Sequence, residues 1–437
     1  MADRQSPGES RIKSKTVYCG QSVMQRKKIF ELLPRQVWTL ADALGIVGIV
    51  FISFYYLTAF RFPSLITQPS RQVDFGILYT FPWLIFHDAH YPSLAPFPYP
   101  PSAVVMLLPL HMLPQHIAFV VWLLAQAASL WIVVWSSIKL SGAANWPGRW
   151  ALGCIGVLLT DNPLSWDLRN HNSNLVILAI VMLGFVSRRA WVSALLLAAS
   201  AGLKVYSGLL IFLIAWWREW RLAGLTAASM CGIFILLPVL VFGPADFVQV
   251  LRDWLDQVRF TTTLEGYYYG THIITLRRAF ATLLDSDPSS KAVIVLWRGS
   301  EMLWIALVIW YFATANKVNQ FSGYGVAQFA DICVTLLVPL PVSTWLEPYH
   351  AVVMLPAYIL LLTVLFRDEW PSTARVLSAA ALCGPIISRI AIQRLEIRGL
   401  AFLISFSLIV IALAAARRAV HFRPIESTEA NHAPMSK

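Results

Sequence analysis

Long apolar runs separated by short polar breaks constrain this chain more than any other feature. Of its 437 residues, 57% are hydrophobic and only 13% are charged, which is typical of a protein that crosses a membrane several times. Because a backbone in lipid must satisfy its own hydrogen bonds, runs of this length are predicted to be helices. We therefore expect an all-α polytopic membrane protein.

The runs divide into about twelve apolar segments, which predict a bundle of about 12 transmembrane helices, within a range of roughly 10–13. The run 103–138 is expected to break near Pro114. Some segments are short: 190–203 would reach about 21 Å as a helix, whereas a hydrocarbon core is about 30 Å thick. We expect such segments to tilt, to stop part-way or to face a cavity. The predicted segments are 42–60, 103–138, 150–160, 173–187, 190–203, 204–217, 222–242, 291–313, 325–341, 350–366, 374–391 and 399–416.

The charge pattern predicts how the chain is oriented. Lys and Arg number 34 against 23 Asp and Glu, and their clustering in tails and short loops favours membrane orientation over nucleic-acid binding. Residues 1–36 are predicted to be a basic cytoplasmic tail, 37–420 the transmembrane domain and 421–437 a polar C-terminal tail. The connections then assigned to the cytoplasm hold Lys139/Arg149, Arg188/Arg189, Arg218/Arg221, Lys317, Arg367/Arg375 and Arg417/Arg418. The regions assigned to the outside are 61–102, 161–172, 243–290 and 343–349.

No metal or cofactor is expected. The five cysteines lack the close spacing of a disulfide framework or a metal site. The sequence also lacks the motifs of zinc proteases, P-loop ATPases and serine hydrolases.

Asp74 directly precedes an aromatic segment, 75–86, which is too short to cross a membrane. This segment suits a helix lying on the membrane surface. Asp74 at its start can be a helix cap, a base, or both.

A proline-rich stretch, "YPSLAPFPYPPSAVV", follows and contains Tyr99. Its prolines predict a stiff extended wall. Aromatic side chains in such a wall could stack on sugar rings or polyprenyl chains, or could simply belong to an interfacial aromatic belt.

The stretch "DNPLSWDLRNHNSNL" gathers hydrogen-bonding side chains, including His171, Asn172 and Asn174, before an apolar segment. Amides at the mouth of a helix suit hydroxyl or phosphate ligands. The alternative is a hydrated loop that caps the following helix.

Lys204 lies in the middle of the apolar stretch 190–217, whose two ends are assigned to the cytoplasm. The stretch is therefore predicted to be a hairpin with the lysine at its outer tip, near Asp74. A snorkelling lysine explains this residue alone, whereas a phosphate partner explains it together with its neighbours.

Two later stretches add further candidates. "TLEGYYYGTHIITLRRAF" contains Arg277, which could clamp a lipid-linked phosphate or simply lie beside headgroups. "VSTWLEPYHAVVMLP" brings Glu347 and His350 to the start of a span. A structural and a catalytic role for His350 are both open, because a buried imidazole needs a partner in either case.

In their order along residues 40–415, these motifs resemble glycosyltransferase family 87, a family of polytopic enzymes of the GT-C superfamily. The resemblance rests on "DF" before an aromatic segment, "PFPYPPSAVVMLLPL", "NHNSNLVILAI", "AASAGLKVYSGLLIFL", "REWRLAG" and "STWLEPYHAVVMLP". It implies a GT-C-like bundle with an extracytoplasmic loop region. It also implies an inverting hexosyltransferase of cell-envelope glycans in the plasma (inner) membrane, with both termini cytoplasmic. The donor would be a polyprenyl-phosphate sugar, often mannose, and the acceptor a lipid or glycan.

The resemblance also assigns residue roles. Asp74 matches the family's catalytic aspartate, His350 its late histidine, Lys204 its lysine and Asn174 the last residue of its Gly-Gln/Asn-x-Asn pattern. His171 departs from the family, since it stands where glycine is usual. The chemistry then requires one base and stabilisation of a departing phosphate. The predicted site is Asp74 and His350 as catalytic residues, with Lys204, Arg277, His171, Asn172, Asn174, Tyr99 and Glu347 binding substrate.

Two other functions are alternatives for a polytopic membrane protein of this kind. A transporter or lipid flippase would line a path across the bilayer with charged residues, whereas here they concentrate on one predicted face. A polymerase or ligase of lipid-linked glycans would use a pyrophosphate-linked donor instead of a monophosphate sugar.

Overall fold

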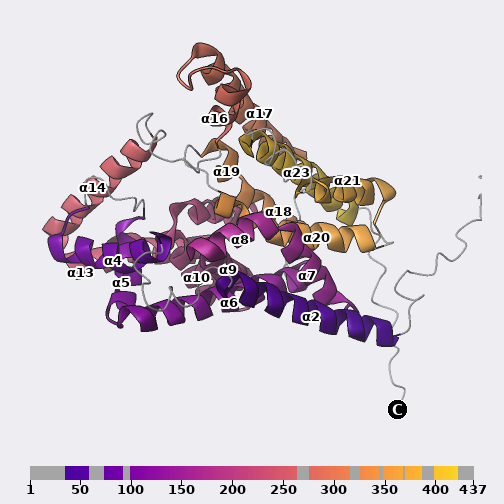
Figure 1. Cartoon of the computed structure of the whole chain (residues 1–437), viewed down its shortest axis with the longest axis horizontal. Coiled ribbons are helices and arrows are strands. Elements are labelled where there is room, and N and C mark those ends of the chain that lie inside the picture. Colours follow the sequence, from indigo (N-terminus) through magenta and orange to yellow (C-terminus); the bar gives the residue numbers. More distant parts are fainter. Residues whose placement is uncertain are drawn as a thin grey trace, which may run out of the picture.

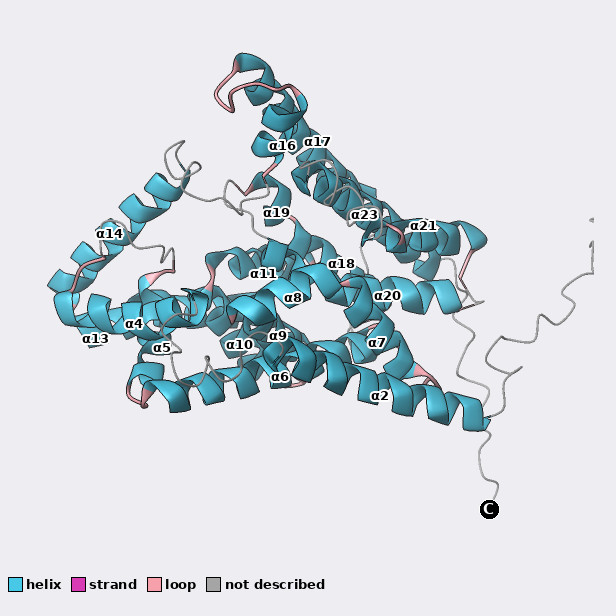
Figure 2. Ribbon diagram, viewed as in Figure 1, coloured by secondary structure: helices cyan, strands magenta, loops and turns pink. Residues whose placement is uncertain are grey.

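The computed structural model describes residues 35–58, 73–91, 99–262, 275–314, 325–343, 348–367, 370–385 and 398–421. Within these ranges all regular structure is helical and no strand occurs (Figure 2). The all-α prediction is therefore confirmed for the described part of the chain.

Six stretches are long and apolar enough to cross a membrane, by length and composition. They involve α2 (Arg35–Thr58), α6 (Gln115–Leu140), α12 to α13 (Trp220–Cys231, Gly232–Leu236 and Leu237–Phe242), α17 (Lys291–Thr314), η4 with α20 (Pro348–Val353 and Met354–Phe366), and α23 (Arg398–His421). The described parts of the predicted apolar segments are largely helical, while a total of about 12 crossings stays a prediction.

The remaining apolar helices are shorter than a bilayer core. They are α5 (Pro101–His111), α7 (Arg149–Leu159), α9 (Asn174–Val186), α10 (Ala190–Leu203), η2 and α11 (Val205–Leu209 and Leu210–Trp216), α18 and α19 (Val326–Leu337 and Pro339–Val342), and α21 (Ser372–Leu382). α9 begins and α10 ends at buried or half-buried polar residues. Non-helical backbone is tolerated at such places because protein, not lipid, surrounds it.

Four further helices are more polar or aromatic: α4 (Val73–Asp88), α8 (Asp161–Asn170), α14 (Pro244–Thr262) and α16 (Leu276–Leu283). α4 confirms the predicted helix after Asp74. α8 lies within 161–172, a region assigned to the outside, and its buried residues include Leu164 and Leu168, so the alternative of a hydrated loop is wrong for most of this stretch.

Only the two ends of the predicted proline-rich wall are described. Residues 92–98 lie outside the described part, Pro100 is extended, and α5 begins at Pro101. Proline is well suited to the first position of a helix because its missing N–H has no intrahelical partner there. The predicted break near Pro114 is confirmed, since α6 begins directly after it.

Apolar packing forms two main clusters of buried side chains. The larger surrounds α20, a helix buried over most of its length, and includes residues of α6, α9, α18 and α23. The second joins α4, α5 and the first half of α6 to α13 and α14. Leu168 and Leu175 belong to the larger cluster, whereas Tyr99 and Leu203 belong to the second. The asparagine-rich segment 170–174 lies where the two clusters meet.

Several connections predicted to be cytoplasmic meet at one end of the bundle. Arg367, after α20, donates to the carbonyl of Gly142, after α6, at 2.9 Å. The backbone N–H groups of Gly148 and Trp150 donate to Asp42 on α2, at 3.0 and 2.8 Å. These contacts agree with the prediction that these connections lie on the same side of the membrane.

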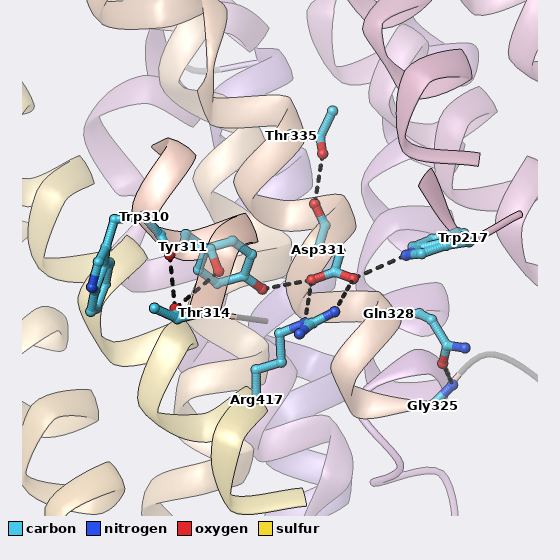
Figure 3. A network of polar contacts seen from close by, with 9 residues as sticks. All are labelled: Trp217, Trp310, Tyr311, Thr314, Gly325, Gln328, Asp331, Thr335 and Arg417. Atoms are coloured by element: carbon cyan, nitrogen blue, oxygen red, sulfur yellow. Dashed lines mark hydrogen bonds and ion pairs between the residues drawn. The ribbon is translucent and has the colours of Figure 1, made fainter. Parts of the chain in front are cut away.

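A buried ion pair joins other elements near this end (Figure 3). Arg417 on α23 donates to both carboxylate oxygens of Asp331 on α18, at 2.7 and 3.1 Å. The same carboxylate accepts from the Tyr311 hydroxyl at 2.8 Å and from the Trp217 indole at 3.0 Å. Asp331 and Arg417 are 0% and 2% exposed, so each charge depends on the other for compensation.

We predict that Arg417→Met destabilises the protein by about 3–5 kcal/mol, because it leaves the Asp331 carboxylate buried without its counter-ion. Denaturant unfolding in detergent micelles measures the change. The neighbouring Arg418 is exposed and lies over the Trp310 ring, so Arg418→Met should cost less than about 1 kcal/mol. Equal losses in the two variants would contradict the prediction.

Candidate functional site

The turn between α8 and α9 forms the centre of the polar cluster. His171 ends α8 in the left-handed conformation, with φ 54°, and directs the chain into Asn172. The side-chain oxygen of Asn172 accepts from the backbone N–H groups of Ser173 and Asn174 at 2.7 and 3.3 Å. Asn172 thereby satisfies donors that the first turn of α9 leaves without intrahelical partners.

Asp74 and Lys204 converge on the Asn172 amide from distant parts of the sequence. Asn172 Nδ2 donates to Asp74 Oδ2 at 3.0 Å, and Lys204 Nζ donates to Asn172 Oδ1 at 3.3 Å. Asp74 lies in the first turn of α4, and Lys204 follows the last residue of α10. Both side chains are half-buried. The structure therefore places a carboxylate and an ammonium on opposite ends of one amide group.

Asn174 forms the next link, at the first residue of α9. Its Oδ1 accepts from Lys204 Nζ at 2.8 Å, and its Nδ2 donates to Asn172 Oδ1 at 2.9 Å and to Asp167 Oδ1 at 3.2 Å. Asp167 Oδ2 accepts from the backbone N–H of Leu175 at 3.2 Å. Asp167 on α8 is thus part of the cluster, although the predicted site did not include it.

Tyr99 forms one aromatic wall beside Lys204. The Lys204 ammonium lies 5.2 Å from the centre of the Tyr99 ring, which allows a cation–π interaction. The Tyr99 hydroxyl hydrogen-bonds the Ser173 hydroxyl at 2.9 Å, and the Tyr99 carbonyl accepts from the Tyr91 hydroxyl at 2.8 Å. Tyr99 is thereby fixed in the cluster from both its backbone and its side chain.

Tyr349 forms a second wall and brings the segment of His350 to the site. The Tyr349 ring lies 6.0 Å from Lys204 Nζ, and the rings of Tyr349 and His350 are 4.7 Å apart. Both residues belong to η4, which packs against α8 and α9. His350 therefore lies near the cluster, while its catalytic role stays a prediction.

Two side chains of α6, which the sequence analysis did not predict, hydrogen-bond the turn. Trp122 Nε1 donates to the carbonyl of His171 at 2.8 Å. Gln126 Nε2 donates to the carbonyl of Asn172 at 3.0 Å, so Gln126 Oε1 faces His171 Nδ1 at 3.2 Å. Because this oxygen can only accept, Nδ1 of His171 carries the proton. No local sequence motif marks residues inside an apolar helix as partners of a distant turn.

The structure does not bring all predicted residues together. Arg277 Nε donates to the carbonyl of Pro288 at 2.9 Å, and its guanidinium lies over the Trp297 ring at 5.2 Å. These contacts hold it between α16 and the start of α17, and α16 stands apart from α8, α9 and α10 in Figure 1. Glu347 lies outside the described residues.

Burial changes the proton affinity of several groups at the site. It raises the pKa of the Asp167 carboxyl, while the Lys204 ammonium and the N–H donors of Asn174 and Leu175 lower it and favour the ionised form. It also raises the pKa of the Tyr99 hydroxyl. Burial lowers the pKa of the His171 imidazole to about 4, so this imidazole is neutral near pH 7.

The arrangement combines two complementary chemical capacities. A half-buried carboxylate can accept a proton from a hydroxyl group. An ammonium held by amide oxygens and aromatic rings can stabilise an anion. Within the described ranges, no group of three or more His, Cys, Asp or Glu side chains gathers to hold a metal ion.

We predict that His171→Asn changes how stability depends on pH. The imidazole pKa is lowered from 6.5 to about 4, so its contribution is fully present above pH 6.5 and is lost as pH falls toward 4. Asn tolerates the left-handed conformation and does not titrate. The thermal midpoint in detergent should therefore fall less steeply in the variant than in the wild type between pH 6.5 and 4.5. The difference between the two proteins should stay constant from pH 7 to 8, and parallel curves down to pH 4.5 would contradict the assignment.

Comparison with known proteins gives a family match. The model of glycosyltransferase family 87 matches residues 97–338, which is more than half of the chain. The matched range contains Tyr99, Asp167, Asn172, Asn174 and Lys204, whereas Asp74 and His350 lie beyond its ends. No solved structure matches the chain significantly.

Two curated relatives carry the same name, polyprenol-phosphate-mannose-dependent alpha-(1-2)-phosphatidylinositol pentamannoside mannosyltransferase. The protein of Mycolicibacterium smegmatis (strain ATCC 700084 / mc(2)155) is 30% identical over 155 residues, which cover 35% of this chain and 36% of the relative. The protein of Mycobacterium tuberculosis (strain CDC 1551 / Oshkosh) is 27% identical over 111 residues, which cover 25% of this chain and 26% of the relative. The chain thus matches about a third or less of the length of these relatives.

Proposed function

We propose, from the premise that this chain belongs to glycosyltransferase family 87, that it is an inverting membrane hexosyltransferase. It moves a sugar from a polyprenyl-phosphate carrier to a lipid or glycan acceptor on the extracytoplasmic side of the plasma membrane. The observation that carries the proposal is the placement of Asp74 and Lys204 on opposite ends of the Asn172 amide.

Asp74 is the general base in this proposal. As the acceptor hydroxyl attacks the anomeric carbon, the Asp74 carboxylate takes its proton, and the bond from that carbon to the phosphate oxygen breaks on the opposite face. A polyprenyl phosphate leaves as a stable anion, so a separate general acid is not required. This is the base half of the inverting arrangement known for glycosidases.

Lys204 stabilises the departing phosphate. Its ammonium is held by the oxygens of Asn172 and Asn174 and lies beside Tyr99 and Tyr349. A cation fixed before the reaction stabilises developing negative charge without a reorganisation cost. His350, beside Tyr349, is proposed to contact the substrate from the same wall.

Mannose is the proposed sugar, because the two relatives are named for dependence on polyprenol-phosphate-mannose. The side of the membrane is proposed from the charge pattern. α9, α10 and α20 each carry site residues at or next to one end and a basic connection next to the other. With the basic connections in the cytoplasm, the site and its acceptor lie outside.

We predict that Asp74→Asn lowers the rate of sugar transfer by about 10²–10⁴-fold, because an amide cannot accept the proton from the attacking hydroxyl. Purified protein is incubated with polyprenyl-phosphate mannose and a panel of lipid and glycan acceptors, and products are identified by mass spectrometry. Asp88→Asn is a matched control, since Asp88 is exposed at the other end of α4 and hydrogen-bonds its neighbour His87. An Asp74→Asn enzyme with wild-type turnover would remove Asp74 from the role of base.

The same panel separates the other functions. Transport of the lipid across vesicle membranes without any sugar transfer would support a flippase. Transfer only from pyrophosphate-linked glycans would support a polymerase or ligase. Either result would contradict the proposed function.

We predict that Lys204→Met lowers kcat by about 10²–10³-fold, the loss typical when one fixed group that stabilises an anion is removed. The thioether chain keeps most of the lysine's apolar volume but not its charge. Steady-state kinetics with polyprenyl-phosphate mannose measure the effect. Lys291→Met is the control, because Lys291 is an exposed residue at the start of α17. Equal kinetics in both variants would contradict a phosphate-stabilising role for Lys204.

A further inference from the structure

We infer that Asp167 is a positioning residue, which sets the orientation of the side-chain amides of Asn174 and Asn172 and thereby directs an N–H group onto Asp74 and carbonyl oxygens onto Lys204. The inference deepens the proposed function and rests on it for the meaning of these contacts. It assigns a role to a residue that touches neither proposed reacting group in any described hydrogen bond.

The Asp167 carboxylate is enclosed by protein. Its side chain is 0% exposed, and its two oxygens accept from Asn174 Nδ2 and from the backbone N–H of Leu175, each at 3.2 Å. These two N–H groups and the nearby Lys204 ammonium favour the ionised form, and an ionised carboxylate has acceptors only. The group that faces Asp167 Oδ1 must therefore be a donor, which fixes the amino end of the Asn174 amide at that point.

The orientation of the Asn174 amide determines which of its atoms faces Lys204. Both hydrogens of its Nδ2 have partners, namely Asp167 Oδ1 at 3.2 Å and Asn172 Oδ1 at 2.9 Å. Its Oδ1 is left to face Lys204 Nζ, at 2.8 Å. In the opposite orientation the amino group would point at the ammonium, and two donors would meet.

Asn172 passes the orientation on to Asp74. Its Oδ1 accepts from four N–H groups, on the backbone of Ser173 and Asn174 and on the side chains of Asn174 and Lys204. This surplus of donors leaves Nδ2 to face Asp74 Oδ2, at 3.0 Å. The direction of each hydrogen bond along this series thus follows from the acceptor character of Asp167.

A simple helix cap would not require this carboxylate. Asp167 also accepts from the first turn of α9, through the N–H of Leu175, and a neutral Asn or Ser could provide that single bond. A fully buried carboxylate carries a desolvation cost that a neutral side chain avoids. The second bond, to Asn174, needs a second acceptor oxygen, which a carboxylate has and an amide lacks.

The reciprocal exchange of the two side chains tests the inference. In Asp167→Asn, one end of the new amide is a donor, so it confronts either the Leu175 N–H or the amino group of Asn174. Asn174→Asp places a second carboxylate against Asp167. In the double variant Asp167→Asn/Asn174→Asp, the amide oxygen at 167 can accept from Leu175, its amino group can donate to the carboxylate at 174, and that carboxylate can accept from Lys204. The bond from residue 174 to Asn172 Oδ1 is not restored, so the rescue is expected to be partial.

Enzyme kinetics provide the first readout. We expect each single variant to lower kcat by more than about tenfold, with the double variant faster than either. Asp331→Asn is the matched control, because Asp331 is also 0% exposed and ion-paired but lies with Arg417. It should lower the thermal midpoint without changing kcat or KM of the remaining folded protein. Wild-type kcat in Asp167→Asn, or a double variant no faster than the slower single variant, would overturn the inference.

Chemical labelling of Lys204 provides a readout that needs no catalysis. A water-soluble acylating reagent modifies only the neutral amine, and mass spectrometry of the peptide containing Lys204 gives its rate. If Asp167→Asn turns an amino group toward the ammonium, the neutral form is favoured and acylation should be about tenfold faster, equivalent to one pKa unit. The double variant should return toward the wild-type rate, and an unchanged rate in Asp167→Asn would overturn the inference. Absence of sugar transfer by the wild type would instead contradict the proposed function, and the labelling result would still decide the role of Asp167.

Discussion

The hydrogen bonds of the Asn172 side chain are the interaction on which the site depends. One amide group satisfies the start of α9, donates to Asp74 and accepts from Lys204. These groups come from α4, from the turn after α8 and from the end of α10. The fully buried polar groups at this junction must find partners within the protein, whereas Asp74 and Lys204 are half-buried. The ends of α8 and α10 and the start of α9 lie beside this amide.

Two groups of charged side chains in the described part of the bundle differ in character. Near the end where the basic connections meet, Asp331 and Arg417 compensate each other and also bind Tyr311 and Trp217. At the site, Asp74 and Lys204 are half-buried and separated by an amide. The first arrangement joins helices through fully buried charges. The second arrangement leaves a carboxylate and an ammonium partly exposed, so that a substrate could contact both.

Sequence reasoning identified most of the helices, because apolar runs in a membrane protein have few alternatives to helical structure. It also placed Lys204 near Asp74, because the basic residues on both sides of 190–217 required a hairpin. It assigned 161–172 to a polar region outside the membrane and did not include Asp167, a buried partner of Asn174, in the predicted site. It grouped Arg277 with the site, whereas this residue contacts Pro288 and Trp297.

The sequence by itself determined the all-α architecture, the break at Pro114, and the presence of Asp74, Asn172, Asn174 and Lys204 beside helix ends. These features follow from local hydrophobicity, proline geometry and charge asymmetry, which act over neighbouring residues. Only the tertiary structure decided that Asp167, Gln126 and Trp122 support the turn at 171–174. Their partners lie on other helices, and which helix faces meet depends on the packing of the whole bundle and not on any local pattern.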